Sequence, residues 1–129
     1  MLKVRIFSFS YLYSDLPEDT TGNGGGFIFD CRFIENPGRN IEFFDLTGKD
    51  DAVKNFLDKQ QEMQEFLKNT FNIIDPAIKN YLSRNFTDLM VSFGCTGGQH
   101  RSVYSAQKLE EHINQKYPEV KTELTHINL

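Results

Sequence analysis

Several features that would assign the chain to a specialised class are missing from its 129 residues. There is no tryptophan, and the two cysteines, Cys31 and Cys95, are too few for the disulfide framework of a small secreted domain. No run of about 18 apolar residues is long enough to span a bilayer, and the amino terminus lacks the continuous apolar stretch of a signal peptide. We therefore expect a reduced, cytoplasmic protein with no membrane contact, cofactor or bound metal, while a Cys31–Cys95 disulfide stays open.

An excess of basic residues is missing too. The chain has 14 Lys and Arg against 18 Asp and Glu, and its net charge is −4. This balance disfavours non-specific binding to nucleic acid, which depends on neutralising phosphates with Lys and Arg. A local basic site stays open, because four arginines are candidates to converge: Arg32, Arg39, Arg84 and Arg101. The twelve Phe and five Tyr supply the apolar area for a core.

Hydrophobic periodicity predicts an α/β fold with one domain over residues 1–129. Strands are expected over residues 2–9, 27–33, 88–94 and 120–127, with loops over 14–26 and 35–49. A helix capped by Asp50 is expected to run to about residue 69, after which Pro76 either kinks it or starts a second helix. Another helix is expected over residues 102–117. The fold class is a single-domain sheet of about four mainly parallel strands with flanking helices.

The most informative segment is the turn between the third strand and the last helix, which reads Gly-Cys-Thr-Gly-Gly-Gln-His-Arg-Ser over residues 94–102. Glycines allow a backbone to approach a ligand closely, and a helix start offers free N–H groups with a partial positive charge. Arg101 adds a bidentate fork for phosphate or carboxylate, His100 adds a hydrogen-bond donor when it is protonated, and Thr96 and Ser102 add hydroxyl groups. The turn therefore predicts a binding site for an oxyanion.

A second candidate lies at the end of the second strand, where Asp30 and Arg32 share one face. Two interpretations stay open. Asp30 either pairs with Arg32 or Arg101 at the edge of the sheet, or lies beside the anion turn and holds Arg101 or a sugar hydroxyl. Cys31 points to the opposite face and is expected in the core.

These segments together resemble a known family. GCTGGQHRSVY resembles the signature of the carboxyl-terminal domain of the RapZ RNase adapter family, and FIFDCRFIENP resembles that family's second signature. LTGKDDAVKNFL and SFSY resemble two further segments, in the same order along the chain. The resemblance implies a fold similar to a phosphofructokinase subdomain and a pocket for a phosphorylated amino sugar, glucosamine-6-phosphate.

The resemblance also implies which residues line the pocket. Combined with the residues chosen from their chemistry alone, these residues give the predicted ligand-binding set: Asp30, Arg32, Cys95, Thr96, Gly97, Gly98, His100, Arg101 and Ser102. Family members carry a kinase-like domain with a Walker loop before this one, and no such loop occurs here. Some members bind RNA and end in a Lys/Arg-rich tail, whereas this chain ends ELTHINL and has Leu12 where a Lys is common.

Two other functions stay open beside a non-catalytic sensor for a sugar phosphate. Cys95 and Arg101 have the Cys-x5-Arg spacing of cysteine phosphatases, in which Cys95 would be the nucleophile, Arg101 the phosphate clamp and Asp30 the general acid. An RNA adapter domain is the third possibility, which the acidic charge and the missing tail disfavour.

Overall fold

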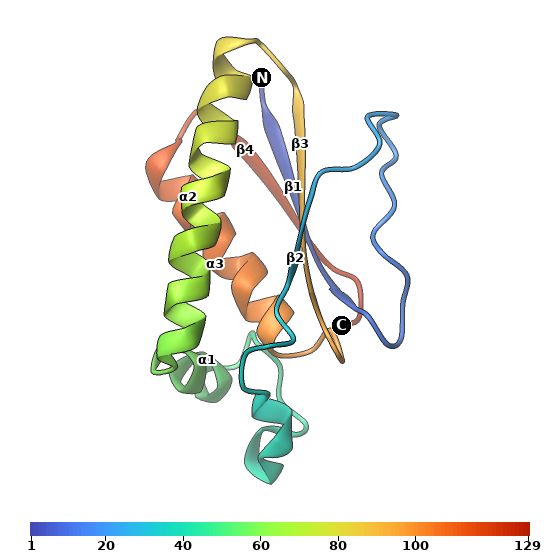
Figure 1. The fold of residues 1–129 in the computed structure, drawn as a ribbon, viewed down its shortest axis with the longest axis vertical. Coiled ribbons are helices and arrows are strands. Elements are labelled where there is room, and N and C mark those ends of the chain that lie inside the picture. The colour runs from blue at the N-terminus through green and yellow to red at the C-terminus, as the bar shows by residue number, and fades with distance from the viewer.

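The computed structural model describes residues 1–129, and its centre is a sheet of four parallel strands. The strands are β1 Lys3–Ser10, β2 Phe27–Asp30, β3 Asp88–Cys95 and β4 Lys121–His126. Their order across the sheet is β2-β3-β1-β4, so β1 and β3 are the central pair (Figure 1). This confirms the predicted fold class. Each predicted strand begins within about one residue of the observed one, but β2 ends three residues earlier than expected.

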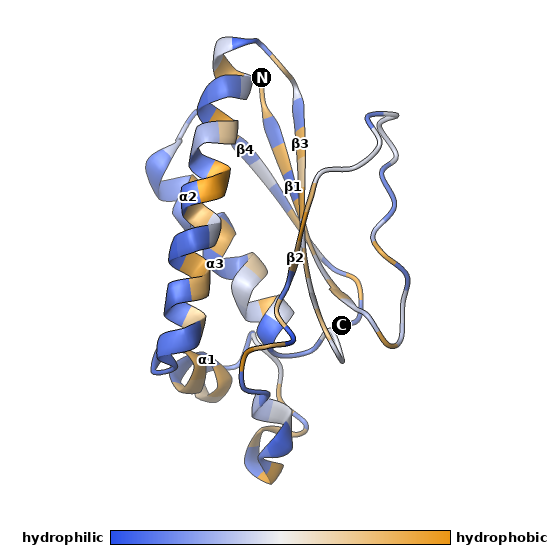
Figure 2. Cartoon of the chain, in the orientation of Figure 1, coloured by the Kyte–Doolittle hydropathy of each residue, from blue (hydrophilic) through white to orange (hydrophobic).

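The helices gather on one face of this sheet (Figure 1). They are α1 Asp51–Asp58, α2 Gln61–Ser83 and α3 Arg101–Lys116, and two short 3-10 helices, η1 Pro37–Arg39 and η2 Ile41–Phe43, precede them. The apolar stripe of α2 faces inward through buried Met63, Leu67, Ile74 and Ile78 (Figure 2). None of the three α-helices combines the length and apolar character that a bilayer crossing requires.

The position of the helix break differs from the prediction. The chain leaves helical geometry at Gln60, whose backbone is extended, and α2 then continues through Pro76 without ending. The burial pattern supplies the reason. Leu57 and Met63 are successive buried residues six positions apart, a spacing that one continuous helix cannot keep on one face. A new helix with a shifted phase therefore starts at Gln61. Of the two roles predicted for Pro76, the start of a second helix is wrong, because α2 runs through it; the helical run divides at Gln60 instead.

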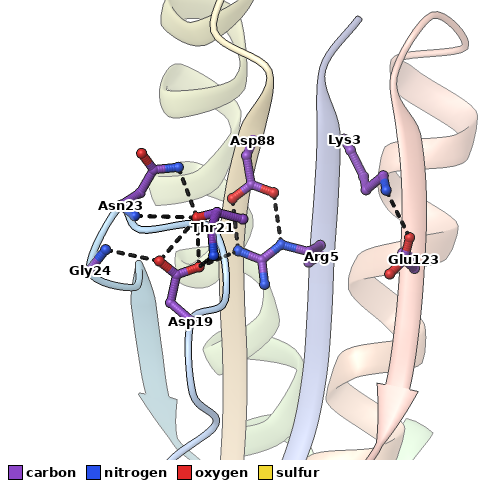
Figure 3. Close-up of polar contacts among 8 residues, drawn as sticks. All are labelled: Lys3, Arg5, Asp19, Thr21, Asn23, Gly24, Asp88 and Glu123. Carbon is purple, nitrogen blue, oxygen red and sulfur yellow. Dashed lines mark hydrogen bonds and ion pairs between the residues drawn. The ribbon is translucent and has the colours of Figure 1, made fainter.

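The other face of the sheet is crossed by the segment over residues 11–26, which joins β1 to β2 (Figure 1). One polar cluster fastens it there, since Arg5 of β1 donates to Asp88 of β3 at 2.7 Å and to Asp19 of the segment at 2.7 Å (Figure 3). Asp19 also accepts from the Thr21 hydroxyl at 2.7 Å and from the Gly24 N–H at 2.9 Å. These hydrogen bonds, that of Thr21 first, hold the pKa of Asp19 far below its usual value. The segment is thus tied down despite its glycines.

The topology indicates where on the sheet a ligand site is expected. From β1 the chain runs across the open face toward β2, whereas from β3 it passes through α3 on the helical face toward β4. The connections thus leave β1 and β3 in opposite directions, and in open α/β sheets such a point forms a crevice at the carboxyl ends of the strands. The residues that follow β1 and β3 meet at that edge. The amino terminus lies at the opposite end of β1 (Figure 1).

Candidate anion-binding site

The turn between β3 and α3 requires glycine at Gly98, whose φ is +65°. A Cβ there would lie 2.7 Å from the Asn128 Oδ1 and 2.9 Å from the Ser10 N, so no other residue fits without a shift. Ser10 secures the same turn, because its hydroxyl donates to the Thr96 carbonyl at 2.6 Å. The turn after β3 is therefore held against the end of β1 and the carboxyl-terminal segment.

The first turn of α3 lacks the side chains that usually satisfy a helix start. His100 occupies the N-cap position without a side-chain cap, and the first turn contains no acidic residue. Its amide groups therefore retain their attraction for an external anion.

Arg101 is only 3% exposed, although it carries a permanent charge. Its Nη1 donates to the carbonyls of Arg32 at 2.9 Å and Ile34 at 2.8 Å, and its Nη2 lies 3.5 Å from the Thr96 Oγ1. Its Nε has no hydrogen-bond partner. Asp30, which was a candidate to hold Arg101, pairs with Arg32 instead at 2.6 Å. A buried cation that lacks a carboxylate partner favours an anion beside it.

Gln99 and His100 anchor the segment over residues 35–48 to the start of α3. The Gln99 side-chain amide donates to the carbonyls of Phe44 at 2.9 Å and Leu46 at 2.7 Å. His100 Nε2 lies 2.9 Å from the Phe43 carbonyl, which can only accept, so this nitrogen carries the proton and Nδ1 is an acceptor in the neutral ring.

Gly48 completes the attachment of this segment. A Cβ on Gly48 would lie 2.5 Å from the His100 carbonyl oxygen, so only glycine allows the segment to pack so closely. The segment predicted as a loop over residues 35–49 is thus fixed in place by these contacts.

Between these elements lies a cavity of about 260 Å³. It is lined by Tyr13, Asn36, Gly38, Phe44, Cys95, Thr96, Gly97, Gln99, His100 and Arg101. The cavity therefore combines the start of α3, the cationic side chain of Arg101 and two aromatic rings. No three His, Cys, Asp or Glu side chains gather where they would hold a metal ion.

The two cysteines differ in position, since Cys95 lines the cavity and Cys31 does not. Cys95 is almost fully buried, and its Sγ lies 3.1 Å from the Ser102 Oγ. Cys31 belongs to the core, as predicted, and burial raises the pKa of its thiol far above the usual value. Both thiols are free, so the disulfide left open by the sequence is not formed.

The structure brings together five of the nine predicted site residues, which line the cavity: Cys95, Thr96, Gly97, His100 and Arg101. The other four lie outside it. Ser102 is buried under Cys95, Gly98 packs on the end of β1, and Asp30 pairs with Arg32 at the surface. Arg32 stacks on the Tyr11 ring at 3.9 Å and lines a smaller cavity that shares Thr96.

The predicted convergence of arginines is limited. Arg84 stacks on Phe86 at 4.2 Å, just before β3 begins, and thus lies at the end of the sheet opposite the cavity.

Sequence reasoning missed the residues that other segments contribute to the cavity: Tyr13, Asn36, Gly38, Phe44 and Gln99. Only Asn36 and Gln99 lay within motifs already noted. Tyr13 and Phe44 carry no local signal, since each reaches the cavity through a turn whose path depends on tertiary contacts.

Comparison with known proteins supports the resemblance. The profile described as the RapZ C-terminal domain matches residues 2–129. A "Nucleotide-binding protein" of Thermosipho africanus is 40% identical over 114 residues, which are 88% of this chain and 39% of that protein. Another protein of that name, from Glaesserella parasuis, is 34% identical over 120 residues, or 93% of this chain and 40% of the relative. The chain thus spans about two fifths of the length of these curated relatives.

Proposed function

Since the chain belongs to the RapZ C-terminal domain family, we propose that it binds a small phosphorylated ligand at the start of α3 and acts as a non-catalytic sensor. The ligand class is a sugar phosphate or a similar oxyanion, of which the family resemblance suggests glucosamine-6-phosphate. The signal would pass to another domain or protein, for which the kinase-like domain implied by the family resemblance is the candidate.

One observation carries this proposal. The guanidinium of Arg101 is buried, is held in place by two backbone carbonyls, and has no carboxylate partner. Its neighbours at the cavity are the uncapped amides of α3 and the Thr96 hydroxyl. A phosphate at this position gains charge-assisted hydrogen bonds from an arginine that is already oriented.

An amide-shift NMR titration of one sample with phosphate, citrate, glucosamine-6-phosphate and a short RNA tests the proposal. We expect the first three to shift the amides of Thr96 to Ser102 before any others. Largest shifts in residues 14–26 or 120–127 would show that the site is elsewhere. The RNA arm should give no tight binding near physiological salt, because the net charge is −4.

A phosphatase is the second candidate, and the 3.1 Å contact between Cys95 Sγ and Ser102 Oγ favours it. A hydroxyl at that distance can stabilise a thiolate next to a helix start. The general acid is lacking, however. Hydrogen bonds from Arg32 lower the pKa of Asp30, so at neutral pH this carboxylate is ionised and has no proton to give.

The two candidates differ in the expected behaviour of Cys95. For a sensor, wild-type protein should hydrolyse no aryl phosphate above buffer, and Cys95→Ser should bind phosphate within about tenfold of wild type, or roughly 1.4 kcal/mol. Hydrolysis that disappears in Cys95→Ser, together with phosphate-protected alkylation below pH 7, would establish the phosphatase instead.

The name of these relatives, "Nucleotide-binding protein", suggests a nucleotide as a further ligand. These proteins are about two and a half times as long as the matched segment, so their nucleotide site can lie in either part. Within this chain, the cavity beside Arg101 is the place where a nucleotide phosphate would bind.

A further inference from the structure

The two cysteines of the chain lie opposite one another on neighbouring strands. β2 and β3 pair in parallel up to Asp30 and Gly94, and the Cys31 N–H donates to the Gly94 carbonyl at 2.7 Å. The next step of this register sets Cys31 beside Cys95. Neighbouring strands are about 4.7–4.9 Å apart, which lies within the Cα separation of roughly 4.4–6.8 Å that disulfides require. The backbone therefore places the two residues at a separation that a disulfide can bridge.

Both side chains also point to the same face of the sheet. Two positions earlier, Phe29 and Phe93 are register partners, and their ring centroids are stacked 5.5 Å apart. Side chains alternate along a strand, so Cys31 and Cys95 project to the face that these rings share. Both cysteines accordingly belong to the core between the sheet and the helices.

The first turn of α3 contacts both sulfur atoms. The Cys95 Sγ lies 3.1 Å from the Ser102 Oγ. The Cys31 Sγ lies 3.8 Å from the Ser105 Oγ. Ser102 and Ser105 are three positions apart and are therefore neighbours on one helix surface. The two sulfur atoms thus lie against adjacent points of the same helical turn.

The two thiols differ in their access to solvent. Cys95 lines the cavity at the start of α3, whereas Cys31 is wholly buried and lines no cavity. Burial, and then the charge of Cys95, raises the pKa of the Cys31 thiol, so this thiol stays protonated and unreactive by itself. The Ser102 hydroxyl can turn to donate a hydrogen bond to a Cys95 thiolate. Cys95 is therefore the thiol that a small oxidant in the cavity meets first.

The position of Cys31 connects the pair to Arg101. The Ile34 N–H donates to the Cys31 carbonyl at 3.2 Å. The carbonyls of Arg32 and Ile34 in turn hold the Arg101 guanidinium. A bond between the two cysteines would act on the turn that orients this guanidinium, so the pair is suited to sensing an oxidant next to the cavity.

We propose that Cys95 and Cys31 are a redox pair that forms a reversible disulfide when hydrogen peroxide enters the cavity. The Cys95 thiolate attacks one peroxide oxygen and becomes a sulfenic acid, while the O–O bond breaks and the released hydroxide takes up the proton that Cys95 lost. The Cys31 sulfur then attacks the Cys95 sulfur and the S–O bond breaks. The departing hydroxide takes the Cys31 proton and leaves as water. Two thiols are thereby oxidised and one hydrogen peroxide is reduced to two water molecules. Both thiols are free in the structure, which is the reduced state of the pair.

Hydrogen peroxide added to the reduced whole chain tests the pair. In wild type we expect an intact mass lower by two hydrogen atoms, the loss of both thiols in a titration under denaturing conditions, and a peptide in which residues 31 and 95 are linked. Dithiothreitol should restore both thiols, and non-reducing electrophoresis should show a single chain, because the bond is intramolecular. A wild-type protein that keeps both thiols, gains oxygen atoms instead, or forms links only between chains would overturn the proposal.

Matched variants test the order of the two steps. Cys31→Val leaves Cys95 without a second thiol, so a sulfenic acid should accumulate at Cys95, where dimedone traps it. Cys95→Val should lose its remaining thiol roughly tenfold more slowly than Cys31→Val, because Cys31 is buried. Equal rates in the two variants would overturn the assigned order.

A measurement on wild type covers the case in which a variant does not fold. Iodoacetamide should alkylate Cys95 of the reduced protein before Cys31, and the reverse order would overturn the assignment. None of these outcomes requires phosphate to bind, so they are independent of the proposed function.

Discussion

Replacement of Arg101 separates its role in the fold from its role in binding. Its Nη1 supplies hydrogen bonds to two carbonyls, and each bond from a charged donor contributes roughly 1.5–3 kcal/mol. Arg101→Ala removes both but also relieves a buried charge without a carboxylate partner, which offsets part of the loss. We expect the free energy of unfolding to fall by about 2–4 kcal/mol.

The same substitution should also remove a charge-assisted hydrogen bond to phosphate. Its loss should weaken phosphate binding by about 1.5–3 kcal/mol, which corresponds to roughly 10- to 150-fold in Kd. Arg101→Lys keeps the charge but loses the planar fork, so it should recover only part of both quantities. Urea unfolding measures the free energy of unfolding, and calorimetry measures the affinity for phosphate. At a phosphate concentration 100 times Kd, wild type should also gain about 2.7 kcal/mol of stability.

Two results would refute this reasoning. A folded Arg101→Ala protein that binds phosphate with wild-type affinity would show that the guanidinium is not the counter-ion. An Arg101→Lys protein of full affinity would show that the fork geometry is not used. The NMR amide spectrum of each variant serves as the control that the turn over residues 94–102 is retained.

Three further predictions concern the fold around the site. Gly98→Ala should lower the free energy of unfolding by about 1–3 kcal/mol, because the φ of Gly98 is +65°. In Gly97→Ala the new Cβ would meet no atom within 4 Å, so its free energy of unfolding should stay within about 1 kcal/mol of wild type. Equal urea midpoints for the two variants would contradict this. Burial, and then the charge of Lys49, lowers the pKa of His126 from 6.5, so the unfolded chain binds more protons than the folded one. The free energy of unfolding should therefore fall as pH drops below about 6.5, and His126→Gln should remove this pH dependence. An unchanged pH dependence in the variant would assign it to other groups. Asp19→Asn should speed amide hydrogen exchange over residues 14–26 and leave β3 protected, whereas Asp15→Asn should change neither; equal exchange in both variants would show that the Arg5 contact does not fasten the segment.

Local patterns were enough to predict the strands and the last helix, because alternation and the apolar stripe record which face is buried. They misplaced the division of the long helical region, since Pro76 is a more conspicuous signal than a change of phase between Leu57 and Met63. That change of phase was nevertheless present in the sequence. The position of the break between the two helices therefore follows the burial pattern and not the proline.

The candidate site was predictable only where one segment supplies it. The turn after β3 contributes backbone, hydroxyl and charge within nine residues, and that density made it visible. The role of Arg101 in holding the carbonyls of Arg32 and Ile34 was not visible, because it depends on how the end of β2 packs against α3. Asp30 illustrates the same limit, since two partners were chemically reasonable and only the packing selects Arg32.

The placement of the amino terminus has a consequence for communication within a longer protein. The matching profile is described as a C-terminal domain, so a domain that precedes it in a longer relative would connect at the amino end of β1. That attachment point and the ligand cavity are joined by one central strand, β1, of eight residues, which spans roughly 26 Å. A strand bonded on both sides to its neighbours does not stretch. Under the proposed sensor function, occupancy of the cavity would therefore be communicated as a tilt or slide of the whole sheet against such a domain. A flexible joint between the domain and β1 would uncouple the two.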